Sequence, residues 1–137
     1  MHSKQILFLI LFVLTSSATN AQMCILDIGS KNSDQIQQVF QLKETQITAL
    51  DEFKVQLNKE ITVLEAQVKE LLETHPQSNS DELLVLAKKH KELEDQMFDV
   101  TVSYDQKLIS LFNEKQYERY VLLCNEAKRS AITRLQE

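Results

Sequence analysis

The stretch ITALDEFKVQLNKEITVLEAQVKEL, residues 47–71, decides the fold because its apolar residues return every seven positions. Ile47, Ile61 and Val68 share one heptad position. A row of leucines three residues further on shares another: Leu50, Leu57, Leu64 and Leu71. Such a repeat is typical of an α-helix that packs one face against a neighbour, so it predicts a long helix. Pro76 ends this helix, because the residue before a proline is pushed out of the α-helical region.

A second heptad repeat begins after the polar segment 76–80, which predicts a tight connection with Ser80 as the N-cap of the next helix. Its apolar residues form two rows, one of Leu83, His90, Met97, Tyr104 and Leu111 and one of Leu86, Leu93 and Val100. Each long helix would span roughly 30 residues, or about 45 Å. Two such helices with a short connection predict a long antiparallel hairpin.

Shorter helices are expected on both sides of the hairpin. Ser33 or Asp34 can cap a short helix that runs through Phe40. Asn113 followed by Gln116 matches a capping box, so a last helix should start there. We expect this helix to cover the hairpin seam with two apolar rows, one of Tyr117, Cys124 and Ala131 and one of Tyr120, Val121, Ala127 and Leu135.

The composition predicts an all-α protein. The chain of 137 residues holds one glycine and one proline, the residues on which most turn-rich β architectures depend. Residues 22–32 carry no periodic signal and are expected to form an N-terminal arm. One helical domain over residues 33–137 should follow it.

The first 21 residues match a signal peptide. Lys4 supplies a positive start, Ile6 to Leu14 is an unbroken apolar run, and Ala21 is a small residue suited to cleavage. Nine apolar residues are too few for a membrane span, which needs about 20. We therefore expect an exported protein, residues 22–137, with no membrane span after cleavage.

Cys24 raises the alternative of a lipoprotein, because it lies just beyond the apolar run. Gln22 and Met23 stand before it, where a lipidation signal has small residues, so we expect no lipid anchor. Cleavage after Ala21 removes one lysine and no acidic residue, so the formal charge falls from −5 to −6. This balance disfavours nucleic acid as a partner, because neutralising phosphates needs a basic stripe.

The motifs of common enzyme chemistry are missing from the sequence. It has no nucleophile elbow, phosphate loop, paired-cysteine zinc pattern or HExxH helix, so we expect no enzyme and no cofactor. The many Asp and Glu residues are expected at solvent-facing heptad positions. His75 would lie beside the hairpin turn and His90 about four helical turns further along the partner helix, so we expect no metal site.

Cys24 and Cys124 are the two cysteines, and an oxidising compartment permits a disulfide between them. Three states are open: a bridge within one chain, a bridge between two chains, or a buried Cys124 with Cys24 free. We favour the bridge within one chain, which would pin the arm to the last helix, because a free thiol near an exposed end is reactive.

Two short strings at the helix junctions look alike. Leu42-Lys43-Glu44-Thr45-Gln46 opens the first long helix, and Phe112-Asn113-Glu114-Lys115-Gln116 opens the last one. Both resemble the LTxxQ motif, which occurs twice, at these two places, in the periplasmic proteins of the Spy/CpxP family. The resemblance covers about residues 34–135 and includes Tyr104-Asp105-Gln106-Lys107-Leu108 before the second string. The sequence departs from the motif at Lys43, Phe112 and Asn113, and a lysine side chain cannot accept a backbone N–H.

The resemblance implies a periplasmic binding protein that holds unfolded or stress-damaged envelope proteins without ATP. The same family contains envelope stress or metal sensors that act by contact with a membrane protein, and this is the alternative function. A third possible function is that of a structural helical dimer that binds no client. We also expect a homodimer, because four residues beside the main stripe widen the apolar arc: Leu72, Leu84, Val85 and Phe98.

Overall fold

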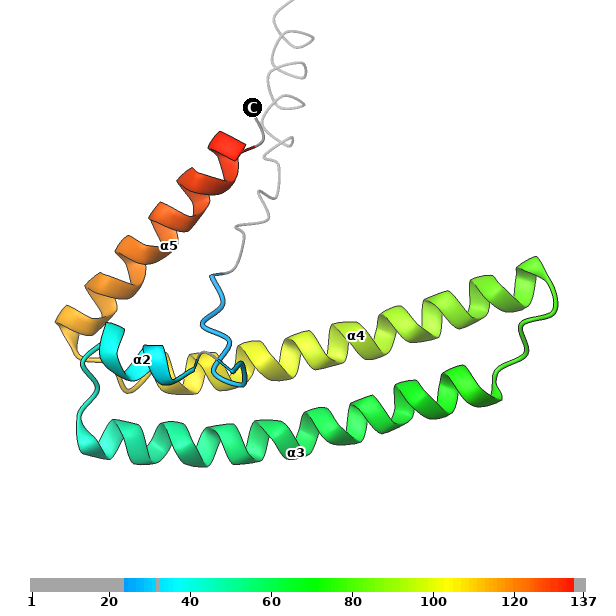
Figure 1. Ribbon diagram of the computed structural model, residues 1–137, viewed down its shortest axis with the longest axis horizontal. Helices are drawn as coiled ribbons and strands as arrows, with labels where there is room; N and C mark the ends of the chain where they lie inside the picture. Colours follow the sequence, from blue (N-terminus) through cyan, green and yellow to red (C-terminus); the bar gives the residue numbers. More distant parts are fainter. Residues whose placement is uncertain (1–23, 32, 135–137) are drawn as a thin grey trace, which may run out of the picture.

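The computed structural model describes residues 24–31 and 33–134, and in this part of the chain it contains four helices and no strand (Figure 1). The helices are α2 (Asp34–Val39), α3 (Glu44–Thr74), α4 (Ser80–Ile109) and α5 (Glu114–Arg134). The predicted all-α class is confirmed. The proposed signal peptide lies outside the described residues. None of the described helices is long and apolar enough to cross a membrane.

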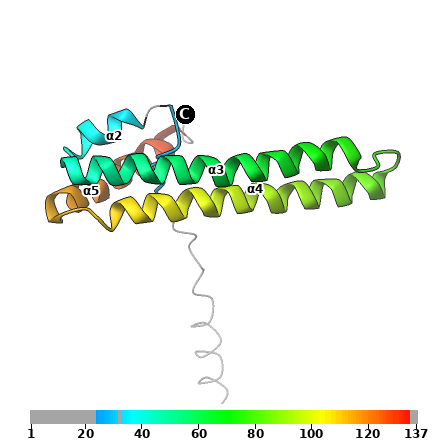
Figure 2. The same ribbon diagram turned by 90° about the horizontal axis from the view of Figure 1, so that it is seen from below.

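Helices α3 and α4 lie side by side and run in opposite directions, and residues 75–79 join them at one tip (Figures 1 and 2). The leucine row of α3 faces this seam, and Leu50, Leu57 and Leu64 are buried there. From α4, Tyr104 fills the seam and its hydroxyl donates to Glu60 Oε1 at 2.5 Å. The leucine row of α3 therefore marks the surface that packs against α4, whereas Leu83 and Leu111, predicted in one row with Tyr104, are exposed.

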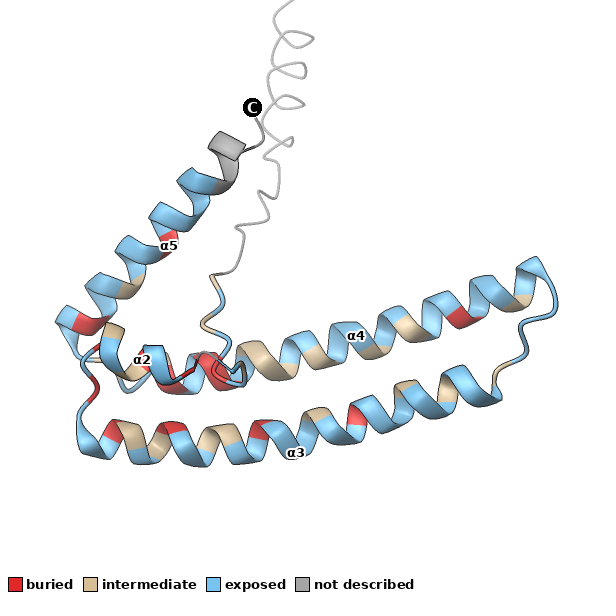
Figure 3. Cartoon of the chain, in the orientation of Figure 1, coloured by how far each residue is buried: buried red, intermediate tan, exposed pale blue. Residues whose placement is uncertain are grey.

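The apolar core lies toward the base of this helix pair, at the end away from the tip (Figure 3). It joins both long helices to α2 and to the arm through eight buried side chains: Ile28, Ile36, Phe40, Leu42, Leu50, Leu57, Tyr104 and Leu108. Towards the tip, most positions of α3 and α4 are exposed or partly exposed. The base is thus the part of the protein with an interior.

Two helix ends, the start of α4 and the end of α2, differ from the sequence prediction by one residue. Asn79, not Ser80, caps α4: its Oδ1 accepts the Glu82 N–H at 3.0 Å. Asn79 has the extended backbone of an N-cap, whereas Ser80 already belongs to the helix. Helix α2 stops at Val39, and the side chain of its N-cap, Ser33, makes no capping hydrogen bond.

The prediction that the last helix covers the hairpin seam is wrong for the described residues. Helix α5 leaves the base at an angle to α4, and the N-terminal arm enters the space between them (Figure 1). Tyr117 is 51% exposed and Val121 is also exposed. The side chain of Ala131 and all of Leu135 lie outside the described residues. The apolar rows of α5 face the arm in part and solvent in part, because the turn into α5 directs the helix away from the seam.

Candidate functional site

The two motif-like strings meet at the base, where each opens a helix in the same way. Gln46 and Gln116 are buried in the first turns of α3 and α5. The Lys43 N–H donates to Gln46 Oε1 at 2.9 Å, and the Asn113 N–H donates to Gln116 Oε1 at 2.9 Å. Each glutamine therefore satisfies a backbone donor that the start of a helix leaves without an intrahelical partner.

The two glutamine side chains also bind each other. Gln46 Nε2 donates to Gln116 Oε1 and Gln116 Nε2 donates to Gln46 Oε1, both at 2.9 Å. The backbone N–H that each Oε1 accepts fixes the orientation of its amide, because only the oxygen can accept it. This reciprocal contact, called the amide pair below, joins two chain segments 70 residues apart.

The second N–H of each glutamine amide donates to a backbone carbonyl near the start of the other glutamine's helix. Gln46 Nε2 donates to the carbonyl of Leu111 at 2.6 Å, just before the second string. Gln116 Nε2 donates to the carbonyl of Phe40 at 3.1 Å, just before the first string. Among the described residues, no buried side-chain nitrogen or oxygen lacks a hydrogen-bond partner. The amide pair is therefore fully bonded, the condition under which buried polar groups add rigidity.

The other residues of the strings support the same junctions. Asn113 Oδ1 accepts the Gln116 N–H at 3.0 Å, which completes the predicted capping box of α5. At the first string the Lys43 carbonyl accepts the Gln46 N–H at 2.9 Å, so a lysine side chain is tolerated at this position. Leu42 is buried, and the ring of Phe112 packs on Phe40 with centroids 4.8 Å apart.

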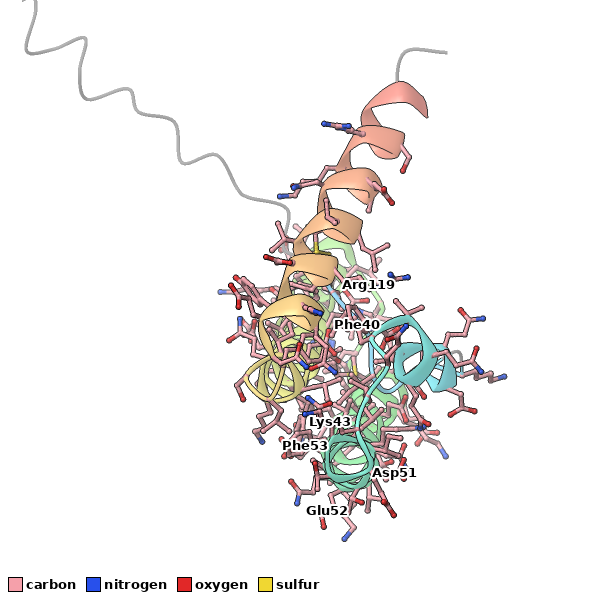
Figure 4. All side chains as sticks on the ribbon, turned by 90° about the vertical axis from the view of Figure 1, so that its left-hand side faces the viewer. Phe40, Lys43, Asp51, Glu52, Phe53 and Arg119 are labelled. Carbon is pink, nitrogen blue, oxygen red and sulfur yellow. A yellow bond between two sulfur atoms is a disulfide. The ribbon has the colours of Figure 1, made fainter. Side chains whose placement is uncertain are left out.

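The chain between α2 and α3 reverses through Gln41, which has a φ of 48°. The Leu42 N–H donates to the carbonyl of Gln37, and the Gln41 N–H to that of Gln38. This is the Schellman pattern of a helix C-terminus, with a glutamine where glycine is usual. It turns the carbonyl of Phe40 towards Gln116. Phe40 lines a small hollow at the base together with Arg119 of α5 (Figure 4).

A buried carboxylate holds the N-terminal arm against α4. Asp105 is 2% exposed and accepts three successive backbone N–H groups, from Leu26 at 2.7 Å, Asp27 at 2.9 Å and Ile28 at 3.1 Å. Burial raises the pKa of Asp105, and the three N–H groups oppose that shift. The side chain of Ile28 is fully buried in the core. The arm is thus docked by both polar and apolar contacts.

Asp105 was not predicted as a functional residue, and the expectation that the acidic residues face solvent is wrong for it. Its partners are backbone groups of a segment without any periodic pattern, so spacing could not reveal them. The available signal was its place beside Tyr104, in the string that precedes the second motif.

The structure joins Cys24 and Cys124 by a disulfide within the chain, one of the three states left open by the sequence. The bridge links the arm to α5 across 100 residues of sequence. Next to it, the Tyr120 hydroxyl donates to the Cys24 carbonyl at 2.9 Å. A thioether-linked lipid on Cys24 would need the same sulfur atom, so lipidation and this bridge exclude each other.

A cavity of about 330 Å³ opens between the arm, α4 and α5. Its walls combine polar groups, such as Gln106, with aliphatic and aromatic side chains. These apolar side chains are Ile25, Val102, Ile109, Tyr117 and Tyr120. This space is called the arm cleft below, and the side chain of Asp105 also lines it.

The described residues contain no cluster of three or more His, Cys, Asp or Glu side chains that could hold a metal ion. His75 Nδ1 lies 2.8 Å from the carbonyl of Pro76, and His90 Nδ1 lies 3.5 Å from Glu94 Oε1. Each histidine is thus engaged locally.

A comparison of the chain with protein-family models, curated proteins and solved structures finds no match in any of the three.

Loss of either glutamine should weaken the base. Gln46→Ala and Gln116→Ala should each lower the free energy of unfolding by about 1–3 kcal/mol, because each leaves buried groups unpaired. The double variant should lose less than the sum of the two, by about 0.5–3 kcal/mol, because the residues share one network. Urea unfolding measures all three. The exposed Gln56→Ala of α3 is the control and should stay within about 0.5 kcal/mol of wild type. Additive losses would contradict the pairing.

The raised pKa of Asp105 predicts a dependence of stability on pH. A carboxyl whose pKa is higher in the folded state contributes stability that is fully present below the unfolded pKa and is lost as pH rises through the folded pKa. Asp105→Asn removes this titration. The free energy of unfolding of the wild type, relative to that of Asp105→Asn, should therefore fall between about pH 3 and about pH 7. The opposite trend would mean that the three N–H bonds outweigh the desolvation of the carboxylate.

Proposed function

We propose that this protein is an exported, periplasmic helical binding protein that holds unfolded or stress-damaged envelope proteins without ATP. The observation that carries the proposal is the number of large apolar side chains that the thin fold leaves exposed. On α4, Leu84 is 69% exposed and Phe98 is 46% exposed. Exposed apolar surface with a polar border is typical of an interaction site.

These side chains extend over much of the described surface instead of forming one pocket. They occur on the arm, on α3, α4 and α5, and in the turn between α4 and α5: Ile25, Val55, Val63, Leu72, Leu83, Leu84, Val85, Phe98, Leu111, Tyr117, Val121, Leu122 and Leu123. Charged pairs lie between them, such as Lys91 with Asp95 and Lys69 with Glu73. Dispersed apolar residues among charges suit an unfolded client, which offers short apolar segments in no fixed geometry.

The base supports membership of the Spy/CpxP family as part of this proposal. The residues that meet in the amide pair, Gln46 and Gln116, are the last residues of the two LTxxQ-like strings. Export and the periplasmic location rest on the sequence pattern of residues 1–21. The proposal includes no catalytic step, no cofactor and no nucleic acid partner.

The mature protein should suppress aggregation of a chemically unfolded client at about equimolar amounts and without ATP. Because the protein is acidic, a basic client should be captured faster than an acidic one. Added salt should slow the capture of the basic client, since screening acts over about 8 Å at physiological ionic strength. Light scattering of one basic and one acidic client, each at low and high salt, measures both effects.

The matched variants separate apolar capture from general effects on folding. Val55→Gln combined with Val63→Gln should reduce suppression, because it removes two exposed apolar side chains of α3 that lie outside the set proposed below for a dimer contact. The exposed Gln56→Asn on the same helix keeps the apolar surface and should act as wild type. Absence of suppression with both clients would refute the chaperone function and favour the alternative, a stress or metal sensor that contacts a membrane protein.

We also propose that the protein is a homodimer. Leu72, Leu84, Val85 and Phe98 are all exposed beside the α3–α4 seam, so a second copy would bury surface that one chain leaves open. Sedimentation at micromolar concentration should give about twice the mass of the mature chain, and Leu84→Gln with Phe98→Gln should lower it. A wild-type protein that sediments only as a monomer would contradict this proposal.

A further inference from the structure

Contacts at its first turn and around Tyr120 and Cys124 attach α5 to the other described residues. Its first turn is held by Gln116 in the amide pair. Further along, Tyr120 and Cys124 hold it to the arm. Among the described helices, only α3 and α4 pack along their lengths. The direction of α5 beyond its first turn therefore depends on the arm.

The arm is fastened to the hairpin independently of α5. Asp105 accepts its three backbone N–H groups, and Ile28 is fully buried in the core. The arm is thus held in place on α4. Between the described residues, a hydrogen bond from Tyr120 to the Cys24 carbonyl and the covalent bond between Cys24 and Cys124 join α5 to the arm, and the ring of Tyr120 also packs against the core.

We propose that this disulfide is a redox clamp that sets the angle of α5 and thereby the width of the arm cleft. In the oxidised protein the clamp holds Tyr117 and Tyr120 of α5 over Ile25 of the arm and Ile109 of α4. In the reduced protein the hydrogen bond of Tyr120 and the packing of its ring near the start of α5 remain, and a single neutral hydrogen bond is weak in water. Helix α5 then moves about its first turn, and the arm cleft opens. This clamp does not depend on the proposed client binding.

The chemistry requires a dithiol reductant, such as a thiol–disulfide oxidoreductase of the same compartment. Cys24 is half-buried and lines the arm cleft, whereas Cys124 is 7% exposed, so attack falls on the sulfur of Cys24. A thiolate of the dithiol forms a bond to Cys24 Sγ, and the bond to Cys124 Sγ breaks. Cys124 leaves as a thiolate and takes up a proton. The second thiol of the reductant then displaces Cys24, so the dithiol is oxidised to a disulfide and the protein gains two thiols.

The test measures the position of α5 with spin labels on azide-bearing side chains, which leave both cysteines untouched. One pair of labels replaces the exposed Asn125 of α5 and Gln96 of α4. A control pair replaces Gln67 of α3 and Gln96. Pulsed electron resonance should give a narrow distance distribution for the first pair in the oxidised protein. After reduction with dithiothreitol, this distribution should become broad and displaced, and the control pair should not change.

Two further variants complete the test. Cys24→Ser combined with Cys124→Ser should match the reduced protein without any reductant. Tyr120→Phe should keep the narrow distribution while the disulfide is intact. The same narrow distribution before and after reduction would overturn the proposal. A control pair that also broadens would overturn it too, because the disulfide would then stabilise the whole fold and not the angle of one helix.

Discussion

The amide pair of Gln46 and Gln116 is the contact on which the rest of the structure depends. Two helix starts and the residues before them converge at the base, and each brings backbone groups that helices leave without partners. Water cannot form hydrogen bonds with groups that the core covers, so the protein must supply their hydrogen-bond partners itself. Each glutamine does so with one oxygen and one NH₂ group, and each engages its own helix, the other glutamine and the opposite junction.

This arrangement has a consequence for the whole shape. The amide pair fixes where α5 begins, and α5 leaves the seam of the long helices from there (Figure 1). The arm lies between α5 and α4, and Asp105 and the disulfide hold it there. The core therefore gathers at the base, and the outer half of the α3–α4 pair has little to cover it (Figure 3). The apolar surface that supports the proposed binding function is thus a result of how the base is built.

The sequence predicted the parts of the fold that depend on local pattern. The seven-residue repeats located α3 and α4, and Asn113 with Gln116 located the start of α5. Periodicity shows which face of a helix is apolar but not what covers it, so the direction of α5 was predicted wrongly. The role of Asp105 was missed because its partners are backbone groups of the arm. The two strings identified both glutamines, but their contact joins segments too distant in sequence for spacing to reveal it.

The most direct test of this account is to observe the amide pair in solution. Nuclear magnetic resonance of a protein of residues 22–137 should show two glutamine side-chain NH₂ groups that exchange slowly with water, and these should belong to Gln46 and Gln116. Cross-relaxation should connect the two groups to each other, because each donates to the other's oxygen. Slow exchange together with this connection is the predicted result. If both groups exchange as fast as those of exposed glutamines such as Gln56, the base is not held as described and the account is wrong.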